Sequence, residues 1–176
     1  FGTPLFLAGK AGCFLLLPRE LQAPIQKRLQ MFVLRAKVKL SDESSSWDRF
    51  GVAGPRAEAL LRNFAGAVPD TLMATVHTEV GRIIKLSADR YIVIASPENA
   101  IAVWHQLSDQ ALPVGAGLWD WLSIQQGIVN ILPATQDAFV PQMTNFELVG
   151  GVSFKKGLYT VQAIVAGAQY RCTCKR

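Results

Sequence analysis

Hydrophobic and polar positions near the start of the chain follow three different patterns. Residues 12–17 form a continuous apolar run, which is typical of a buried strand. Apolar side chains then recur at spacings of three and four, which predicts a helix over residues 18–36. Pro24 is tolerated only in the first turn of a helix, so we expect the helix to start nearer to Gln22. Residues 37–40 alternate charged and apolar side chains, as a half-buried strand does.

A longer series of elements follows. The pattern predicts, in order, a strand at 49–53, a helix at 55–64, a hairpin of strands at 72–78 and 82–86, a strand at 91–95, a helix at 97–110, a strand at 112–116 and a helix at 118–127. Pro55 and Pro97 each stand at a helix start, where a missing N–H is harmless, and Ser96 is suited to cap the second of these helices. The inward faces are predicted to hold Ala57, Leu60, Leu61 and Phe64 on one helix and Val103, Trp104 and Leu107 on the other.

The order of these elements mixes helices with neighbouring antiparallel strands. This predicts an α+β fold with mixed antiparallel sheets and flanking helices, and not a doubly wound parallel sheet. We expect three parts: a first subdomain at 1–46, a second α+β subdomain at 47–127, and an extended segment at 128–176 that returns to the first subdomain. Residues 128–147 show no clean period, and long ordered segments of this kind often carry function.

The chain is basic, with a net charge of +5 and an isoelectric point of 9.3. Its cations gather at residues 19–39 and 155–176, where acids are almost absent. One interpretation is an ordinary solvated surface, and the other is a surface for an anionic partner, either a polyglutamylated cofactor or RNA. The longest apolar runs, such as 91–95, fall far short of the roughly 20 residues that a membrane helix needs, so we expect no membrane partner.

The cysteines and histidines give little sign of a metal or disulfide framework. Cys13, Cys172 and Cys174 are odd in number, so no disulfide scaffold is predicted and a cytoplasmic location is expected. A zinc site usually adds two ligands at set spacing to a cysteine pair, whereas His77 and His105 lie far from the cysteines and from each other. We therefore predict no metal site. Both ends of the sequence are expected to be cut from a longer protein.

The sequence shows few motifs that would identify an enzyme. It contains neither the dinucleotide-binding nor the phosphate-loop glycine pattern, and no Gly-x-Ser-x-Gly. Asp120 lies between Trp119 and Trp121, an arrangement with two interpretations. Either the rings stack on a flat ligand whose edge the carboxylate binds, or the tryptophans pack in the core and the carboxylate faces water.

The last third of the chain carries a recognisable motif. Residues 150–171 read GGVSFKKGLYTVQAIVAGAQYR. This resembles the signature of the folate-binding YgfZ family, a Gly-Gly-Val-Ser-Phe lead followed by Lys-Gly-Cys-Tyr-x-Gly-Gln-Glu-Ile-Val-Ala-Arg. The sequences PATQ at 133–136 and FVPQM at 139–143 match the family's lead-in, and residues 15–40 are similar to its first-domain segment. The elements at 49–116 resemble the related glycine-cleavage T-protein.

The resemblance implies a fold and a set of site residues. The expected fold has ferredoxin-like βαββαβ-type units, as in the folate-binding domains of the aminomethyltransferase fold, with the family's C-terminal barrel lying outside this chain. In this comparison residues 1–46 belong to the first folate-binding subdomain. The cofactor is expected to be tetrahydrofolate, and the residues expected to bind it are Trp119, Trp121, Lys156, Tyr159 and Gln162. No catalytic residue is predicted.

The motif also departs from the family at four positions. Leu158 stands where the family has cysteine, and Val161, Ala163 and Gly167 replace a glycine, a glutamate and an arginine. Leucine is neither a nucleophile nor a metal ligand nor a redox group, so the chemistry of the family's cysteine is expected to be absent. The loss of the glutamate removes a possible hydrogen-bond acceptor for folate.

The resemblance implies a tetrahydrofolate-binding accessory protein for iron–sulfur cluster assembly or repair and tRNA modification, acting with iron–sulfur enzymes. One alternative is a one-carbon transferase of the aminomethyltransferase type. That enzyme needs a carboxylate, but no acid precedes Glu20, and its Leu-Arg-x-Glu-x-Gly helix reads LSIQQG at 122–127. A binding protein is therefore favoured over an enzyme. The other alternative is a degenerate module that binds RNA or protein through its basic segments.

Overall fold

The computed structural model describes residues 5–9, 12–34, 37–149 and 151, with side chains from Cys13 onward. The chain divides into two compact units, one made of Phe1–Val38 with Ala116–Arg176 and the other of Lys39–Gly115. The domain boundaries expected after residues 46 and 127 stay a prediction. Among the described helices, none is both long enough and apolar enough to cross a membrane.

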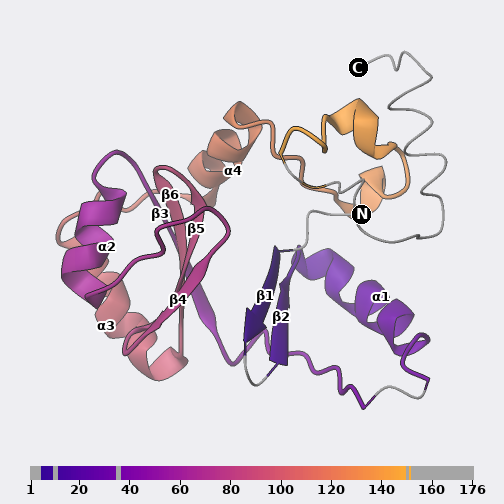
Figure 1. Ribbon diagram of the computed structural model, residues 1–176, viewed down its shortest axis with the longest axis horizontal. Helices are drawn as coiled ribbons and strands as arrows, with labels where there is room; N and C mark the ends of the chain where they lie inside the picture. The colour runs from indigo at the N-terminus through magenta and orange to yellow at the C-terminus, as the bar shows by residue number, and fades with distance from the viewer. Residues whose placement is uncertain (1–4, 10–11, 35–36, 150, 152–176) are drawn as a thin grey trace. The chain divides into compact units, whose positions relative to one another are not determined.

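The first unit begins with a hairpin and a helix (Figure 1). Strand β1 (Leu5–Gly9) pairs antiparallel with β2 (Gly12–Leu16), which confirms the predicted strand, and α1 spans Arg19–Gln30. The expected start near Gln22 is wrong, because Pro24 lies inside α1. Pro24 is exposed, so water can take the place of the backbone hydrogen bond that the proline removes.

The predicted helix is also too long. α1 ends at Gln30, and the amide of Phe32 donates to the carbonyl of Leu29 (3.0 Å) in the tight three-residue pattern typical of a helix end. The predicted strand at 37–40 is wrong as well, since these residues form no strand. Lys37 and its two following residues are exposed, so the alternation has no buried face to occupy.

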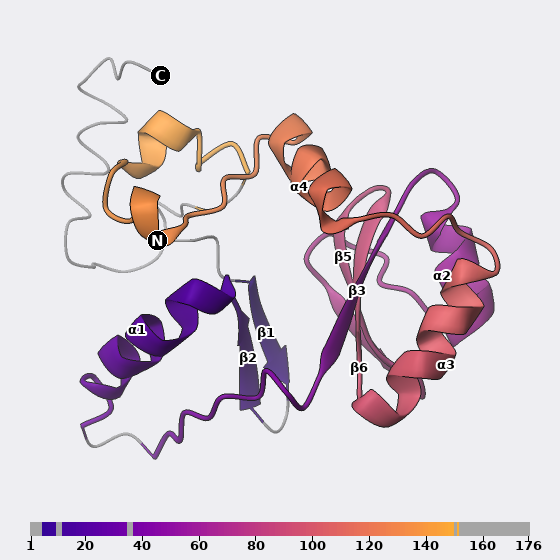
Figure 2. The same ribbon diagram turned by 180° about the vertical axis from the view of Figure 1, so that it is seen from behind.

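The second unit is a four-stranded sheet covered by two helices. Its elements are β3 (Asp48–Ala53), α2 (Ala57–Ala65), β4 (Thr75–Thr78), β5 (Gly81–Ser87), β6 (Arg90–Ala95) and α3 (Pro97–Ser108). The strand order is β3-β6-β5-β4 and every neighbouring pair is antiparallel. Both helices lie on one face of the sheet (Figures 1 and 2). This confirms an α+β fold with an antiparallel sheet.

The core of this unit lies between the sheet and the two helices. Tyr91, Val93 and Ala95 are fully buried and alternate along β6, so their side chains share the face that α2 and α3 cover. Leu61 of α2 and Val103 of α3 pack into the same cluster. The predicted inward positions of both helices are confirmed except for one. That exception, Trp104, is 46% exposed and forms a tilted ring contact with Phe50.

The opposite face of the sheet also holds buried residues. Ile84 and Ile94 lie on this face and are almost fully buried, as is Arg90. Burial lowers the pKa of the Arg90 guanidinium. A strand that is buried on both faces reads as a continuous apolar run, which explains the sequence of β6.

Two predicted strands differ from the structure. Strand β4 starts at Thr75 and not at residue 72, because Met73 adopts a φ of 60°, outside the extended region. No strand forms at 112–116, where the chain instead leads into α4 (Ala116–Gln125), close to the helix predicted at 118–127.

Gly66 and Gly81 lie at two of the turns of the second unit. Gly66 ends α2 in the left-handed conformation (φ 75°), and its amide donates to the carbonyl of Arg62 (2.9 Å). Gly81 has a φ of 141°, and a Cβ atom there would overlap the carbonyl oxygen of Ile94 on β6. Only Gly81 is therefore constrained both by its backbone angle and by a neighbouring strand.

This difference predicts unequal costs for two alanine substitutions. Gly66→Ala is expected to lower the free energy of unfolding by about 1 kcal/mol, the cost of left-handed backbone alone. Gly81→Ala is expected to cost about 3 kcal/mol, because overlap with β6 adds to the backbone strain. Urea unfolding of both variants measures the two values, and equal losses would contradict the role given to the β5–β6 contact.

Candidate functional site

Two of the predicted cofactor residues lie on α4. Trp119 and Trp121 are two positions apart, which places their side chains about 200° apart around a helix. Trp119 is half-buried, Trp121 is 53% exposed, and Asp120 between them is exposed. α4 therefore does not direct both rings to the same ligand face. Of the two, Trp121 is the ring that offers a free surface.

Three large apolar side chains of α4 are exposed beside polar Asp120 and Gln125. Leu118, Trp121 and Ile124 are 44%, 53% and 71% exposed and recur every three residues, so they form a strip along the helix. Buried Ser123 is satisfied locally, since its hydroxyl donates to the carbonyl of Trp119 (3.0 Å). We call Leu118, Trp121 and Ile124 the α4 strip. It suits a flat, largely apolar ligand.

The other three predicted residues, Lys156, Tyr159 and Gln162, lie outside the described residues. So do the four departures from the motif and the Cys172–Cys174 pair. The roles given to them stay predictions. The lead-in to the motif is described as far as residue 149, and again at Gly151.

The lead-in segment is built from short turns. Two 3₁₀ helices, Pro133–Thr135 and Pro141–Thr144, each begin with a proline, which fixes φ at a helix start. The hydroxyl of Thr135 accepts from the amide of Leu132 (3.1 Å), and the hydroxyl of Thr144 donates to the carbonyl of Pro141 (2.9 Å). Local hydrogen bonds therefore hold this segment, as its proline-containing and aperiodic sequence indicates.

A close contact ends the lead-in. The amide of Gly151 donates to the carbonyl of Phe146 (2.9 Å), which closes a turn. A Cβ atom at Gly151 would overlap the ring of Phe146. Steric exclusion thus explains the second glycine of the Gly-Gly-Val-Ser-Phe lead, because the aromatic ring occupies the space that a side chain would need.

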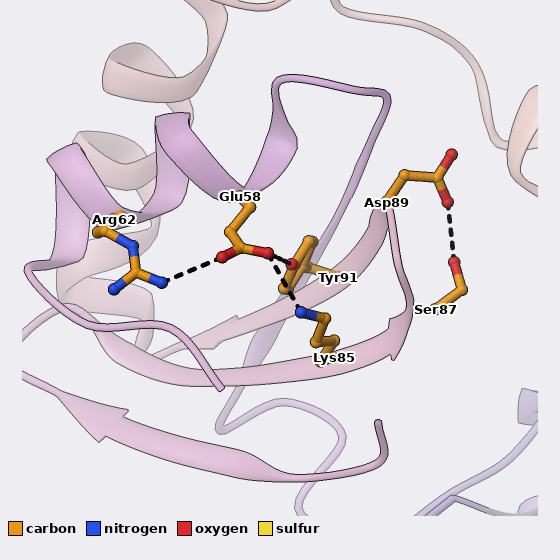
Figure 3. Close-up of polar contacts among 6 residues, drawn as sticks. All are labelled: Glu58, Arg62, Lys85, Ser87, Asp89 and Tyr91. Atoms are coloured by element: carbon orange, nitrogen blue, oxygen red, sulfur yellow. Dashed lines mark hydrogen bonds and ion pairs between the residues drawn. The ribbon is translucent and has the colours of Figure 1, made fainter. Parts of the chain in front are cut away.

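A polar cluster in the second unit was not predicted from the sequence. The carboxylate of Glu58 on α2 accepts hydrogen bonds from the Tyr91 hydroxyl (2.9 Å), Lys85 Nζ (3.1 Å) and the Arg62 guanidinium (3.0 Å), as Figure 3 shows. We call these four residues the Glu58 cluster. The four-residue spacing from Glu58 to Arg62 in the sequence indicates an ion pair along a helix. Another signal in the sequence was Lys85, a charge between Ile84 and Leu86 in a largely apolar strand.

The charges in the Glu58 cluster stabilise one another. The hydrogen bond from Lys85, followed by those from Tyr91 and Arg62, lowers the pKa of Glu58 from 4.5 to about 2. The bond to Glu58 raises the pKa of Lys85, and burial followed by the same carboxylate raises that of Tyr91. Glu58, Lys85 and Tyr91 are thus held in their usual charge states near neutral pH. The cluster ties α2 to β5 and β6 and is poorly suited to proton transfer.

Other candidate sites in the described part of the chain are weaker. An open hollow of about 670 Å³ lies between residues 64–67 and 77–80 of the second unit. Neither Trp119 nor Trp121 lines it. No group of three His, Cys, Asp or Glu side chains within the described ranges is placed to hold a metal ion.

Comparisons with known proteins reveal clear relatives, although no family model matches the chain. It is similar to the tRNA-modifying protein YgfZ of Pectobacterium carotovorum, with 29% identity over 160 residues, which cover 90% of this chain and 48% of that protein. The proteins of the same name from Cronobacter sakazakii and Pectobacterium atrosepticum are 35% and 34% identical over 128 residues. Those matches cover 72% of this chain and 39% and 38% of the relatives. The chain thus spans about half the length of these relatives or less.

The Glu58 cluster predicts a specific dependence of stability on pH. Glu58→Gln should lower the midpoint of thermal unfolding at pH 7, because it removes the negative charge that three donors share. A carboxyl whose pKa falls on folding stabilises the folded state above its unfolded pKa and loses that effect as pH falls. The difference in unfolding midpoint between Glu58→Gln and the wild type should therefore narrow as the pH falls from 4.5 to about 2.

Calorimetry at a series of pH values measures this difference. Glu43→Gln, which changes an exposed acid outside the cluster, is the matched control and should show little difference at any pH. A difference for Glu58→Gln that stays constant down to pH 2 would show that the charge of Glu58 does not stabilise the fold.

Proposed function

Since the chain belongs to the YgfZ family, we propose that it is part of a tetrahydrofolate-binding accessory protein that supports iron–sulfur enzymes and thereby tRNA modification. The observation that carries the proposal is the similarity to YgfZ proteins over 90% of the chain. The name of these relatives supports the link to tRNA modification. The folate and iron–sulfur parts rest on the resemblance of the signature motif to that of the family.

The α4 strip is the described surface best suited to the pterin ring of the cofactor. Trp121 has an exposed ring on which a flat heterocycle can stack, and Leu118 and Ile124 extend the apolar surface along the helix. Trp119 lies on another side of α4 and is half-buried, so we give it a supporting role in holding the helix.

The polar parts of folate require other groups. We assign its polar edge and glutamate tail to Lys156, Tyr159 and Gln162, which keep the family pattern in the sequence. A lysine ammonium forms charge-assisted hydrogen bonds with a carboxylate, and these are stronger than bonds between neutral groups. With Leu158 in place of the cysteine, the chain binds folate without any thiol step.

Calorimetry with tetrahydrofolate under anaerobic conditions tests the proposal. The 176-residue chain should bind, and Trp121→Ala should weaken binding about tenfold, in line with the loss of one aromatic stacking partner. Trp104→Ala is the matched control, because Trp104 is similarly exposed at 46% but lies on α3 in the other unit. An equal loss in both variants would contradict the assignment of the α4 strip.

A second variant tests the motif itself. Leu158→Cys combined with Ala163→Glu restores the family's residues and should strengthen binding, because the glutamate adds a hydrogen-bond acceptor. Binding by this variant alone would show that the departures have disabled the site in this chain. No heat from either protein would contradict the folate proposal.

A further inference from the structure

Helix α1 and the residues after it form a strongly basic part of the first unit. Arg19, Lys27, Arg28 and Lys37 are all exposed, and none forms an ion pair with another described residue. Glu20 is the single acid between residues 19 and 39. A surface that serves only solubility usually mixes both signs of charge. This stretch instead produces a positive potential along one part of the molecule.

Exposed apolar side chains lie beside these cations. Met31 and Phe32 are 63% and 70% exposed and follow Lys27 and Arg28 at a spacing of four. The hydrogen bond from the Phe32 amide to Leu29 continues the helical turn, so residues four apart remain neighbours. At 70% exposed, the Phe32 ring contributes little to the packing of the described part of this unit. It has the chemistry of a base-stacking platform.

The geometry points to RNA as the partner of this surface: we propose that Lys27, Arg28 and Lys37 contact phosphates while an unpaired base stacks on Phe32. We call these four residues the α1 surface. Proteins bind single-stranded nucleic acid by combining a positively charged track with exposed aromatic side chains. Unpaired bases in the loops of a folded RNA are available for such stacking.

A membrane surface fits this arrangement less well. A helix that lies on a membrane exposes an apolar face along its whole length. In α1 that face is turned inward, since Leu21 is only 3% exposed and Ile25 is half-buried. Leu29, at 38% exposed, is the one large apolar residue of α1 that faces water, whereas the more exposed Met31 and Phe32 follow the helix. The choice of RNA also rests on the proposed function, because the relatives are named as tRNA-modifying proteins.

Salt-dependent binding of an unmodified tRNA transcript tests the proposal without folate present. The chain should bind with an affinity that falls as KCl rises, because phosphate contacts release counterions. Lys27→Gln combined with Arg28→Gln should reduce the slope of log K against log [KCl] by about 1.5, since each contact contributes about 0.7 to 0.9. Arg49→Gln combined with Arg56→Gln removes two exposed arginines of the other unit and should leave the slope unchanged.

The role of Phe32 is tested separately by measuring the affinity of the chain for oligouridylate. Phe32→Ala should weaken binding about tenfold with the salt slope unchanged, and Phe32→Trp should restore it, because stacking needs an aromatic face and no charge. All these side chains are exposed, so thermal unfolding should show each variant folded.

Three results would overturn the proposal. They are equal slopes for the two double variants, an unchanged affinity in Phe32→Ala, and binding to vesicles containing phosphatidylglycerol with none to RNA. The last would assign the surface to a membrane. If the chain binds tetrahydrofolate but not RNA, the RNA proposal alone is rejected. If it binds RNA but not tetrahydrofolate, only the folate proposal is rejected.

Discussion

Burial of strand β6 on both faces is the constraint on which the second unit depends. β6 pairs with β3 on one side and β5 on the other, and residues on both of its faces are excluded from water. One face receives α2 and α3 through Tyr91, Val93 and Ala95. Because a strand in this position has no exposed side, its neighbours and their register are strongly specified. The requirement for glycine at the start of β5 follows from the same contact.

Tyr91 links this apolar core to the Glu58 cluster. Its ring is fully buried, while its hydroxyl reaches the carboxylate of Glu58 at the edge of α2. The same carboxylate accepts hydrogen bonds from Lys85 on the neighbouring strand and from Arg62 on its own helix. The polar groups that border the core are thus satisfied by one another. This explains why the most perturbed carboxyl in the described part of the chain fixes structure and is a poor candidate for catalysis.

Sequence patterns predicted the second unit better than the first, for a physical reason. Apolar runs bounded by glycine and proline specify strands and helices that pack on each other locally, as β3, α2, β5, β6 and α3 do. Alternation at residues 37–40 failed because a strand also needs a partner, which a one-dimensional pattern does not supply. The Glu58 cluster joins residues 27 and 33 positions apart, so its sequence signals became meaningful only in the folded chain.

The candidate site was predictable only in part. Its helix was expected from the sequence, but the two tryptophans on it, two positions apart, point to different sides, and the exposed one carries the proposed contact with the pterin. The assignment to the family came from a motif, since neither charge nor periodicity identifies a cofactor. The motif's second glycine has a steric explanation in the ring of Phe146. The chemistry assigned to the residues that follow it rests on the resemblance alone.

Tryptophan emission during a titration tests most directly the proposal that tetrahydrofolate stacks on Trp121. The chain has four tryptophans, and a stacked pterin quenches the one that it covers. We expect saturable quenching that is largely lost in Trp121→Phe and retained in Trp104→Phe. Quenching that does not saturate, or that falls equally in both variants, would contradict it.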